Sequence, residues 1–329
     1  MPNFYDEWLG LWDKATKEKQ EARRVIHAEE IEWVSTPQDA SVGLLAAPET
    51  GFRTWGTVTM IAEIPVGWNT GKHAHGEEGI HIVEGEGFSV VNGVRYDWDK
   101  GTTIWIPFGA THQHFNTGSE PALYYSAMAV HLEHFVGLHK MEQIEECGYT
   151  EYLPETEASP DGLDELGRRI SLRWDDAPRR EGGEDTKKNE AAHFSGDTNE
   201  ATKAAHHAFM LGFMGSPRAG QGFHNKEIEI SGVLGDAPHT HGGRHAHMEA
   251  ILYVLQGEGY TIMDDERVEW KKGSCFHVQG PQTMHQHFVT SDVASHLLRT
   301  APGIRSQFFQ DLAKERFPYQ VFEGAGPNK

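Results

Sequence analysis

The chain carries the stretch GKHAHGEEGIHIVEGEG at residues 71–87 and a near copy, GRHAHMEAILYVLQGEG, at residues 243–259. Each copy is followed downstream by the tetrapeptide His-Gln-His-Phe, which begins at His112 and at His285. A His-x-His pair with a further histidine downstream is typical of a metal site. Similar stretches that recur along one chain indicate a duplicated structural unit. The repeat therefore predicts two related domains, each with histidines grouped to bind a metal.

Composition and charge limit the classes to which the chain can belong. At 329 residues, with 38% hydrophobic and 10% aromatic residues, it is long enough for two globular domains. The formal net charge is −20 with histidine neutral. Nucleic acid and anionic membranes are therefore disfavoured as partners, because their phosphate groups would be repelled. An anionic substrate would need a local cation, either a metal ion or a buried arginine.

Targeting and redox signals are sparse. The N-terminal MPNFYDEWLG lacks a basic start followed by an apolar run. No apolar stretch approaches the roughly 20 residues that a membrane helix needs. The two cysteines, Cys147 and Cys275, indicate no disulfide framework. We expect a cytoplasmic protein.

The pattern along the chain predicts an all-β protein of two jelly-roll barrels with an N-terminal helical arm. Residues 1–42 begin with apolar residues at helical spacing and form the expected arm. Residues 43–150 form the first barrel, the charged segment 151–200 a linker, and residues 201–329 the second barrel with a C-terminal arm. The strands expected in the first barrel are Gly56–Ile64, Gly79–Glu84, Phe88–Val91, Arg95–Trp98, Thr102–Ile106 and Ala122–Val130.

Strand geometry explains why the histidines are paired. Residues i and i+2 of a strand point to the same face, so His73 and His75 share one face, and so do His245 and His247. A third histidine from a neighbouring strand then completes a set of three imidazoles, which suits iron, zinc, copper, nickel or manganese. Three protein ligands leave coordination positions open, as catalysis requires.

The motif spacings resemble those of the cupin superfamily. The first cupin motif is matched by Gly67, His73, His75, Glu78 and Gly85, with one residue fewer before the glutamate than the family pattern has. The second motif is matched at every position, by Gly101, Pro107, Gly109, His112 and Asn116. The resemblance implies a β-barrel with a metal held by motif histidines.

The C-terminal copy departs from the motifs. It keeps His245, His247 and His285, but Ala250 occupies the position of Glu78. Its second motif has Val289 where the first copy has an asparagine, and its Gly-Pro pair is displaced. The resemblance therefore implies metal ligands at His73, His75 and His112 and, in the second copy, at His245, His247 and His285.

Among cupins, the chain is similar to two-domain gentisate, salicylate and 1-hydroxy-2-naphthoate dioxygenases. These enzymes hold Fe(II) with three histidines and open an aromatic ring with O2. The similarity implies an Fe(II)-dependent ring-cleaving dioxygenase of aromatic compound catabolism, with a hydroxylated aromatic acid as substrate and a homo-oligomeric assembly. One departure concerns the substrate: where those enzymes have an arginine for the substrate carboxylate, this chain has Ile80 or Leu252.

Two other functions remain open. Glu78 as a fourth ligand would lower the charge of the site and remove one open position. That arrangement suits a Mn(II)- or Fe(II)-dependent decarboxylase or isomerase acting on a carboxylate. The third hypothesis is a non-catalytic, metal-containing binding protein for small molecules. In each case we expect one or two metal ions per chain.

Four further side chains accompany the ligands in the repeat. His114 and His287 follow the third histidine on the same strand face, so we consider them as acid–base groups or as hydrogen-bonded core histidines. Glu77 and Glu249 align with each other and are interpreted as solvated.

Overall fold

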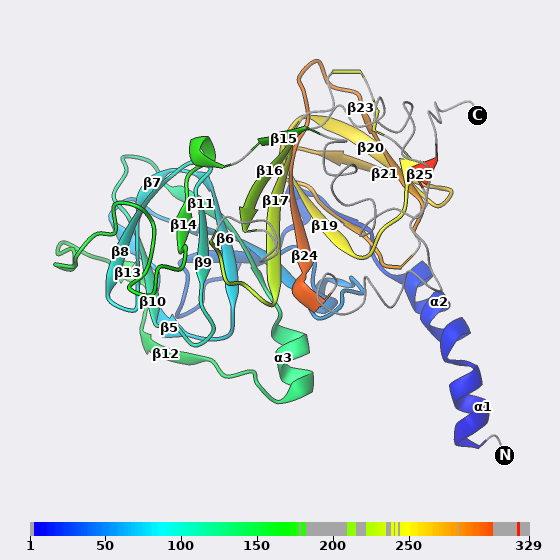
Figure 1. The fold of residues 1–329 in the computed structure, drawn as a ribbon, viewed down its shortest axis with the longest axis horizontal. Coiled ribbons are helices and arrows are strands. Elements are labelled where there is room, and N and C mark those ends of the chain that lie inside the picture. Colours follow the sequence, from blue (N-terminus) through cyan, green and yellow to red (C-terminus); the bar gives the residue numbers. More distant parts are fainter. Residues whose placement is uncertain are drawn as a thin grey trace.

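The structure is a computed structural model, and it describes residues 3–177, 179–181, 209–214, 222–234, 238–239, 241–242, 244–281, 283–304 and 321–322. The described chain is mostly β-strand, arranged as two adjacent barrels with helices at the N-terminus (Figure 1). This confirms the predicted fold class. Much of the expected linker and most of the C-terminal arm lie outside the described residues. Every helix in the described part of the chain is too short or too polar to span a bilayer.

The N-terminal arm consists of α1 (Phe4–Leu9) and α2 (Leu11–Glu21), which extend away from the barrels (Figure 1). The Asn3 side chain caps α1 by accepting hydrogen bonds from the first backbone N–H groups. After the helices, β1 (Val25–Ile26) pairs with a strand of the second barrel before the chain enters the first. The arm is therefore α-helical only in its first half, and a short 3-10 helix at Ala28–Glu30 lies in the second.

The first barrel is built from short antiparallel strands. They are β2 (Ser41–Leu44), β3 (Val58–Ile64), β4 (Trp68–Asn69), β5 (Lys72–Ala74), β6 (Glu78–Glu84), β7 (Glu86–Val91), β8 (Val94–Asp99), β9 (Thr103–Ile106), β10 (His112–Asn116), β11 (Ala122–Met128), β12 (Glu142–Glu145), β13 (Gly148–Tyr149) and β14 (Ser171–Leu172). One helix, α3 (Val130–Val136), follows β11. Among the described residues, one sheet has the order β14-β9-β6-β11-β3-β2. The other has the order β12-β5-β10-β4-β13, with β7 on β10 and β8 on β7.

The second barrel repeats this arrangement. Its strands are β15 (Arg179–Glu181), β16 (Phe209–Met214), β17 (Ile228–Leu234), β18 (Arg244–His245), β19 (Ala250–Gln256), β20 (Glu258–Met263), β21 (Glu266–Lys271), β22 (Cys275–Val278), β23 (His285–Val289), β24 (His296–Pro302) and β25 (Val321–Phe322). The described strands form the sheets β1-β22-β19-β24-β17-β16-β15 and β21-β20-β23-β18-β25. Strands β14 and β15 come from the predicted linker, and each joins a different barrel. The domain boundaries stay a prediction.

Turn residues and apolar faces account for the local structure. Asn92 and Gly93 have φ angles of 49° and 84°, which a two-residue hairpin between β7 and β8 requires. The apolar core crosses the junction between the barrels, because Ile80 of the first belongs to the same buried cluster as Ile230 and Leu298 of the second. Gly79 permits this contact: a Cβ there would lie 2.7 Å from the side chain of Ile230. The barrels are therefore packed closely enough for one to position side chains of the other.

Candidate metal centre

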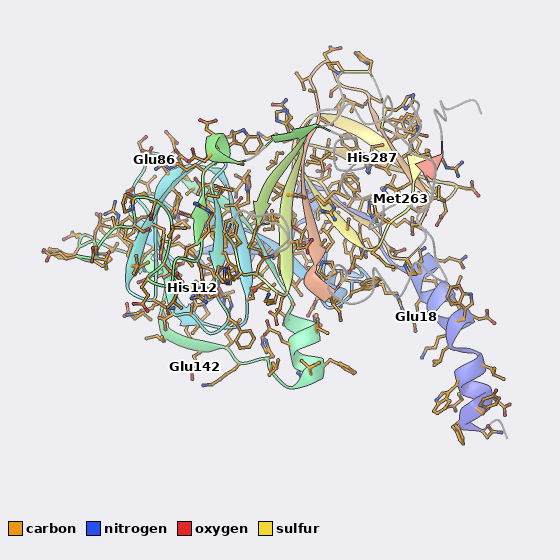
Figure 2. All side chains as sticks on the ribbon, in the orientation of Figure 1. Glu18, Glu86, His112, Glu142, Met263 and His287 are labelled. Carbon is orange, nitrogen blue, oxygen red and sulfur yellow. The ribbon has the colours of Figure 1, made fainter. Side chains whose placement is uncertain are left out.

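Three buried histidines meet inside the first barrel. Antiparallel pairing of β5 with β10 places His73 directly opposite His112, and His75 lies just beyond β5. The ring centroids are 4.1 Å apart for His73 and His112, 4.7 Å for His75 and His112, and 5.0 Å for His73 and His75. One ring nitrogen from each lies within 4.8 Å of the other two. The structure thus brings together the three histidines that the sequence singles out, and Figure 2 labels His112 among the strands of this barrel.

Backbone carbonyls set the tautomer of all three rings. The Nδ1 atoms of His73, His75 and His112 lie 2.8, 2.9 and 2.9 Å from the carbonyl oxygens of Gly71, Gly76 and Ala110, respectively. A carbonyl can only accept, so each Nδ1 carries the hydrogen, and in the neutral form of each ring Nε2 keeps its lone pair. All three Nε2 atoms are buried without a hydrogen-bond partner. They are therefore prepared to bind an electron-pair acceptor.

Glu78 lies at the start of β6 and adds an oxygen to this group. Its Oε1 accepts a hydrogen bond from the Ser126 hydroxyl. Its Oε2 lies 3.4 Å from His75 Nε2 and 3.5 Å from His112 Nε2, and has no hydrogen-bond partner. Burial opposes ionisation of Glu78, but the adjacent His112 and His75 hold its pKa well below the usual range. The carboxylate is thus ionised and turned toward the histidines.

The four donor atoms fit a divalent transition metal. Buried polar atoms without partners are costly, and a cation among them would satisfy all four at once. Burial, together with His112 and His75, lowers the pKa of His73 to about 2, so this ring is neutral at physiological pH, as a ligand must be. Neutral imidazoles with one carboxylate suit iron, manganese or zinc.

His114 has the opposite tautomer to the three other histidines. Trp98 Nε1 donates to the Ser89 hydroxyl at 3.0 Å, and that hydroxyl lies 2.7 Å from His114 Nδ1. Indole only donates, and among the described residues the buried Ser89 hydroxyl contacts no other acceptor, so its single hydrogen is directed to Nδ1 and the hydrogen of the neutral ring is on Nε2. Burial and the nearby His112 lower the pKa of His114 to about 3. His114 is therefore a neutral ring whose Nε2 carries the hydrogen and can act as a donor.

Two residues near His114 carry no signal in the sequence. The Tyr124 ring lies 5.8 Å from the His114 ring, and its hydroxyl donates to the Asp39 carboxylate at 2.5 Å. Asp39 precedes β2, is buried, and has a pKa raised to about 7 by its burial. A single sequence offers no pattern that would bring these two positions, far apart in the chain, to the metal site.

The second barrel reproduces much of this arrangement. His245 pairs with His285 in the backbone register of β18 and β23, and the rings of His247 and His285 lie 4.5 Å apart. The Nδ1 atoms of His247 and His285 contact the carbonyl oxygens of Met248, at 2.5 Å, and Thr283, at 2.9 Å. The side chain of His245 lies outside the described part of the structure.

One feature separates the second barrel from the first, and another is common to both. Ala250 pairs with Val278 at the start of β19, just as Glu78 pairs with Ile106 at the start of β6, so this barrel lacks the carboxylate. The hydrogen-bonded contacts of His114 are repeated at His287. Trp270 donates to Thr261, whose hydroxyl lies 2.8 Å from His287 Nδ1.

The interpretation of Glu77 and Glu249 as solvated is wrong. Their exposed fractions are 2% and 0%, and both carboxylates accept hydrogen bonds from backbone N–H groups of the opposite barrel. Strand alternation, which turns Glu78 inward, turns Glu77 outward toward the junction. The only sequence signal of these contacts is that the two glutamates align in a repeat that is otherwise divergent.

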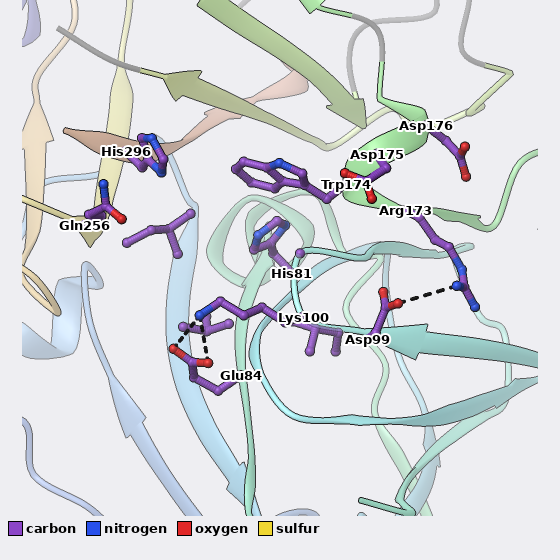
Figure 3. A pocket seen from close by; sticks show the side chains of 14 residues that line it. His81, Glu84, Asp99, Lys100, Arg173, Trp174, Asp175, Asp176, Gln256 and His296 are labelled. Carbon is purple, nitrogen blue, oxygen red and sulfur yellow. Dashed lines mark hydrogen bonds and ion pairs between the residues drawn. The ribbon is translucent and has the colours of Figure 1, made fainter. Parts of the chain in front are cut away.

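A separate cleft of about 600 Å³ lies between the barrels, outside both histidine clusters (Figure 3). Trp174 lies between His81 and His296, with ring centroid separations of 6.1 and 6.4 Å. His81 faces away from Glu78, as its position in the strand predicts, yet it is buried, with Nδ1 2.9 Å from the Thr103 hydroxyl. The cleft is thus separate from the candidate metal centre.

Comparisons with known proteins agree with this architecture. Residues 60–128 match the family model of the cupin domain. A search of curated protein sequences found no significant match. The structure is similar to salicylate 1,2-dioxygenase from Pseudoaminobacter salicylatoxidans in its adducts with gentisate, with a TM-score of 0.60 and 14% identity over 98% of this chain and 95% of that one.

Two further structures extend the comparison. Another structure of the same dioxygenase matches with a TM-score of 0.59 and 12% identity, covering 98% of both chains. A mutant of Bacillus subtilis oxalate decarboxylase matches with a TM-score of 0.62 and 11% identity, covering 92% of this chain and 80% of that one. At these identities the likeness concerns the fold. The chain therefore contains a cupin domain at residues 60–128 and, over nearly its whole length, has the bicupin fold of salicylate 1,2-dioxygenase.

Proposed function

We propose that the chain is a metal-dependent oxidoreductase that uses Fe(II) and O2 to cleave the ring of a hydroxylated aromatic acid. Metal dependence is supported by four buried atoms that converge in the first barrel without hydrogen-bond partners. They are Glu78 Oε2 and the Nε2 atoms of His73, His75 and His112. The choice of reaction is supported by the fold shared with an enzyme whose structure was solved with gentisate.

Four side chains of the first barrel would bind the metal ion. His73, His75, His112 and Glu78 would hold the ion, which when bound would supply redox chemistry toward O2 and positive charge for an anionic substrate. In a chain with a net charge of −20, the ion would be the local cation that such a substrate requires.

His114 would orient the substrate. Its Nε2–H, fixed by Ser89 and Trp98, is a donor on the same strand face as His112. A donor with a fixed hydrogen position favours an oxygen acceptor in one orientation and needs no reorganisation during the reaction. With its pKa near 3, the ring would act as a neutral donor at pH 7.

A second candidate function is a Mn(II)- or Fe(II)-dependent decarboxylase or isomerase of a small carboxylate. The position of Glu78 Oε2 beside His75 and His112 favours it, because a fourth ligand lowers the charge of the ion and leaves less room for a chelating substrate together with O2. The likeness to oxalate decarboxylase is consistent with this alternative.

Metal identity and substrate panels separate the two candidates. The purified protein would be analysed for iron and manganese and tested for O2 consumption with salicylates, gentisates and hydroxynaphthoates. Release of CO2 from small dicarboxylates would be measured in parallel, with His112→Ala as the inactive control. We expect iron and O2 consumption with at least one aromatic acid. Manganese with CO2 release would support the second candidate, and iron-loaded protein inactive on the whole aromatic panel would contradict the first.

A further inference from the structure

The carboxylate of Glu77 binds three consecutive backbone N–H groups of the second barrel. Oε1 accepts from Lys226 at 3.0 Å, Glu227 at 2.8 Å and Ile228 at 3.0 Å, and Oε2 also accepts from Lys226 at 2.8 Å. The backbone N–H of Glu77 in turn donates to Glu227 Oε2 at 3.3 Å. A row of N–H groups of this kind is an anion-binding nest. Here the anion is a side chain of the other barrel.

Glu77 stands between two of the candidate metal ligands. His75 donates through Nδ1 to the carbonyl of Gly76, and Glu78 follows immediately with its carboxylate in the metal site. A shift of the backbone at Glu77 would therefore move the His75 ring and the Glu78 carboxylate together. The backbone is closely packed at the preceding residue as well, because a Cβ at Gly76 would collide with the buried carboxylate of Glu133 on α3.

A glutamate of the second barrel makes the corresponding contact with the backbone of the first barrel. Glu249 occupies the position of Glu77 in the repeat, and both of its oxygens accept from the backbone N–H of Trp55, at 3.0 Å each. Its Oε1 also lies 2.7 Å from His277 Nε2. Trp55 precedes β3 in the first barrel, just as Lys226 precedes β17 in the second. The two glutamates therefore form a reciprocal pair of links across the junction.

We propose that Glu77 is a positioning residue that makes the metal centre of the first barrel depend on the second barrel, and that Glu249 does the same in the reverse direction. The inference rests on the proposed metal site. Groups that fix the orientation of metal ligands typically change metal affinity by about 10–100-fold when removed. Here the orienting group is the backbone of the other barrel, so each histidine cluster would be positioned by a contact from outside its own barrel.

Cobalt binding to the full-length chain tests this directly, because the visible absorption of bound Co²⁺ reports both affinity and ligand geometry. His247→Ala would serve as the parent, so that the signal comes from the first barrel. In this parent, Glu77→Ala is expected to weaken Co²⁺ binding by about 10–100-fold and to alter the spectrum. Glu77→Gln keeps one accepting oxygen but not the charge, and is expected to weaken binding by about threefold or more. Should Glu77→Ala fail to fold, Glu77→Gln carries the test.

Tyr125→Phe is the matched control. The Tyr125 hydroxyl lies 2.8 Å from the Thr300 hydroxyl across the same junction and is buried, but among the described residues it makes no hydrogen bond to residues 73–78. We expect its Co²⁺ affinity to match that of the parent. Parent-like binding by the Glu77 variants, or an equal loss in Tyr125→Phe, would overturn the proposal. If His73→Ala instead bound Co²⁺ as tightly as the parent, the proposed metal site itself would be wrong.

Discussion

Glu78 Oε2 lies 3.4 Å from His75 Nε2, and neither atom has a hydrogen-bond partner. The sequence left the role of Glu78 open, because the spacing before it is one residue short of the cupin pattern. In the structure the Ser126 hydroxyl takes the other carboxylate oxygen and leaves Oε2 directed at the histidines. The short spacing therefore does not turn the carboxylate away from the site.

Removal of this carboxylate should weaken the metal site without emptying it. Glu78→Ala leaves three imidazole donors, so we expect metal affinity to fall by about tenfold or more, equivalent to at least about 1.4 kcal/mol. Ser126→Ala, which removes only the group that orients Glu78, should have a smaller effect. Competition with a chelator of known affinity measures both. Unchanged affinity in Glu78→Ala would show that Oε2 is not a ligand.

The tautomer of His114 should depend on Ser89. Ser89→Ala removes the hydrogen bond to Nδ1, so the ring hydrogen is expected to distribute between Nδ1 and Nε2. Nitrogen NMR of histidine-labelled protein distinguishes the two forms, and metal content should stay at the wild-type level. A ring protonated on Nδ1 in the unsubstituted protein would refute the assignment of His114 as an Nε2–H donor.

Acid should destabilise the metal-free protein partly through His81. Burial lowers the pKa of His81 to about 3, so between pH 6.5 and that value the unfolded state binds a proton that the folded state does not. Stability is therefore lost as pH falls. Between pH 7 and pH 5, the unfolding free energy of the unsubstituted protein should drop by about 2 kcal/mol more than that of His81→Gln. Denaturant titrations at the two pH values measure this, and parallel losses would count against it.

The contribution of Asp39 to the unfolding free energy should change with pH in the opposite direction. Its folded-state pKa of about 7 lies above the unfolded value, so its contribution is fully present below the unfolded pKa and is lost as pH rises through 7. Asp39→Asn keeps an oxygen for the Tyr124 hydroxyl without a charge. We expect the variant to gain about 2–3 kcal/mol relative to the unsubstituted protein between pH 5 and pH 8. The same denaturant experiment measures it, and a constant difference between the two proteins would contradict the prediction.

The sequence predicted those features that depend on short-range periodicity. Alternation in a strand was enough to put His73 and His75 on one face. The Asn92-Gly93 pair, which is typical of two-residue hairpin turns, lies between the expected strands Phe88–Val91 and Arg95–Trp98. The duplicated motif was enough to predict two barrels.

Features that depend on a distant partner could not be read in the same way. Glu77 resembles any exposed glutamate until the backbone of Glu227, 150 positions away, is placed against it. The pairing of β1 with β22 is similar, because Val25 and Ile26 carry no signal that selects the second barrel over the first. The relay from Trp98 through Ser89 to His114 requires the register of three strands, which spacing alone does not provide.

We propose that the first barrel holds a divalent metal at His73, His75, Glu78 and His112. The most direct test is the metal-to-chain ratio of the purified protein compared with that of His112→Ala and Gln113→Ala. Gln113 is the buried neighbour on β10 that faces the other side, where it donates to the carbonyl of Thr70. We expect His112→Ala to lose one metal equivalent per chain and Gln113→Ala to keep it. Equal metal content in all three proteins would contradict a metal site at these residues.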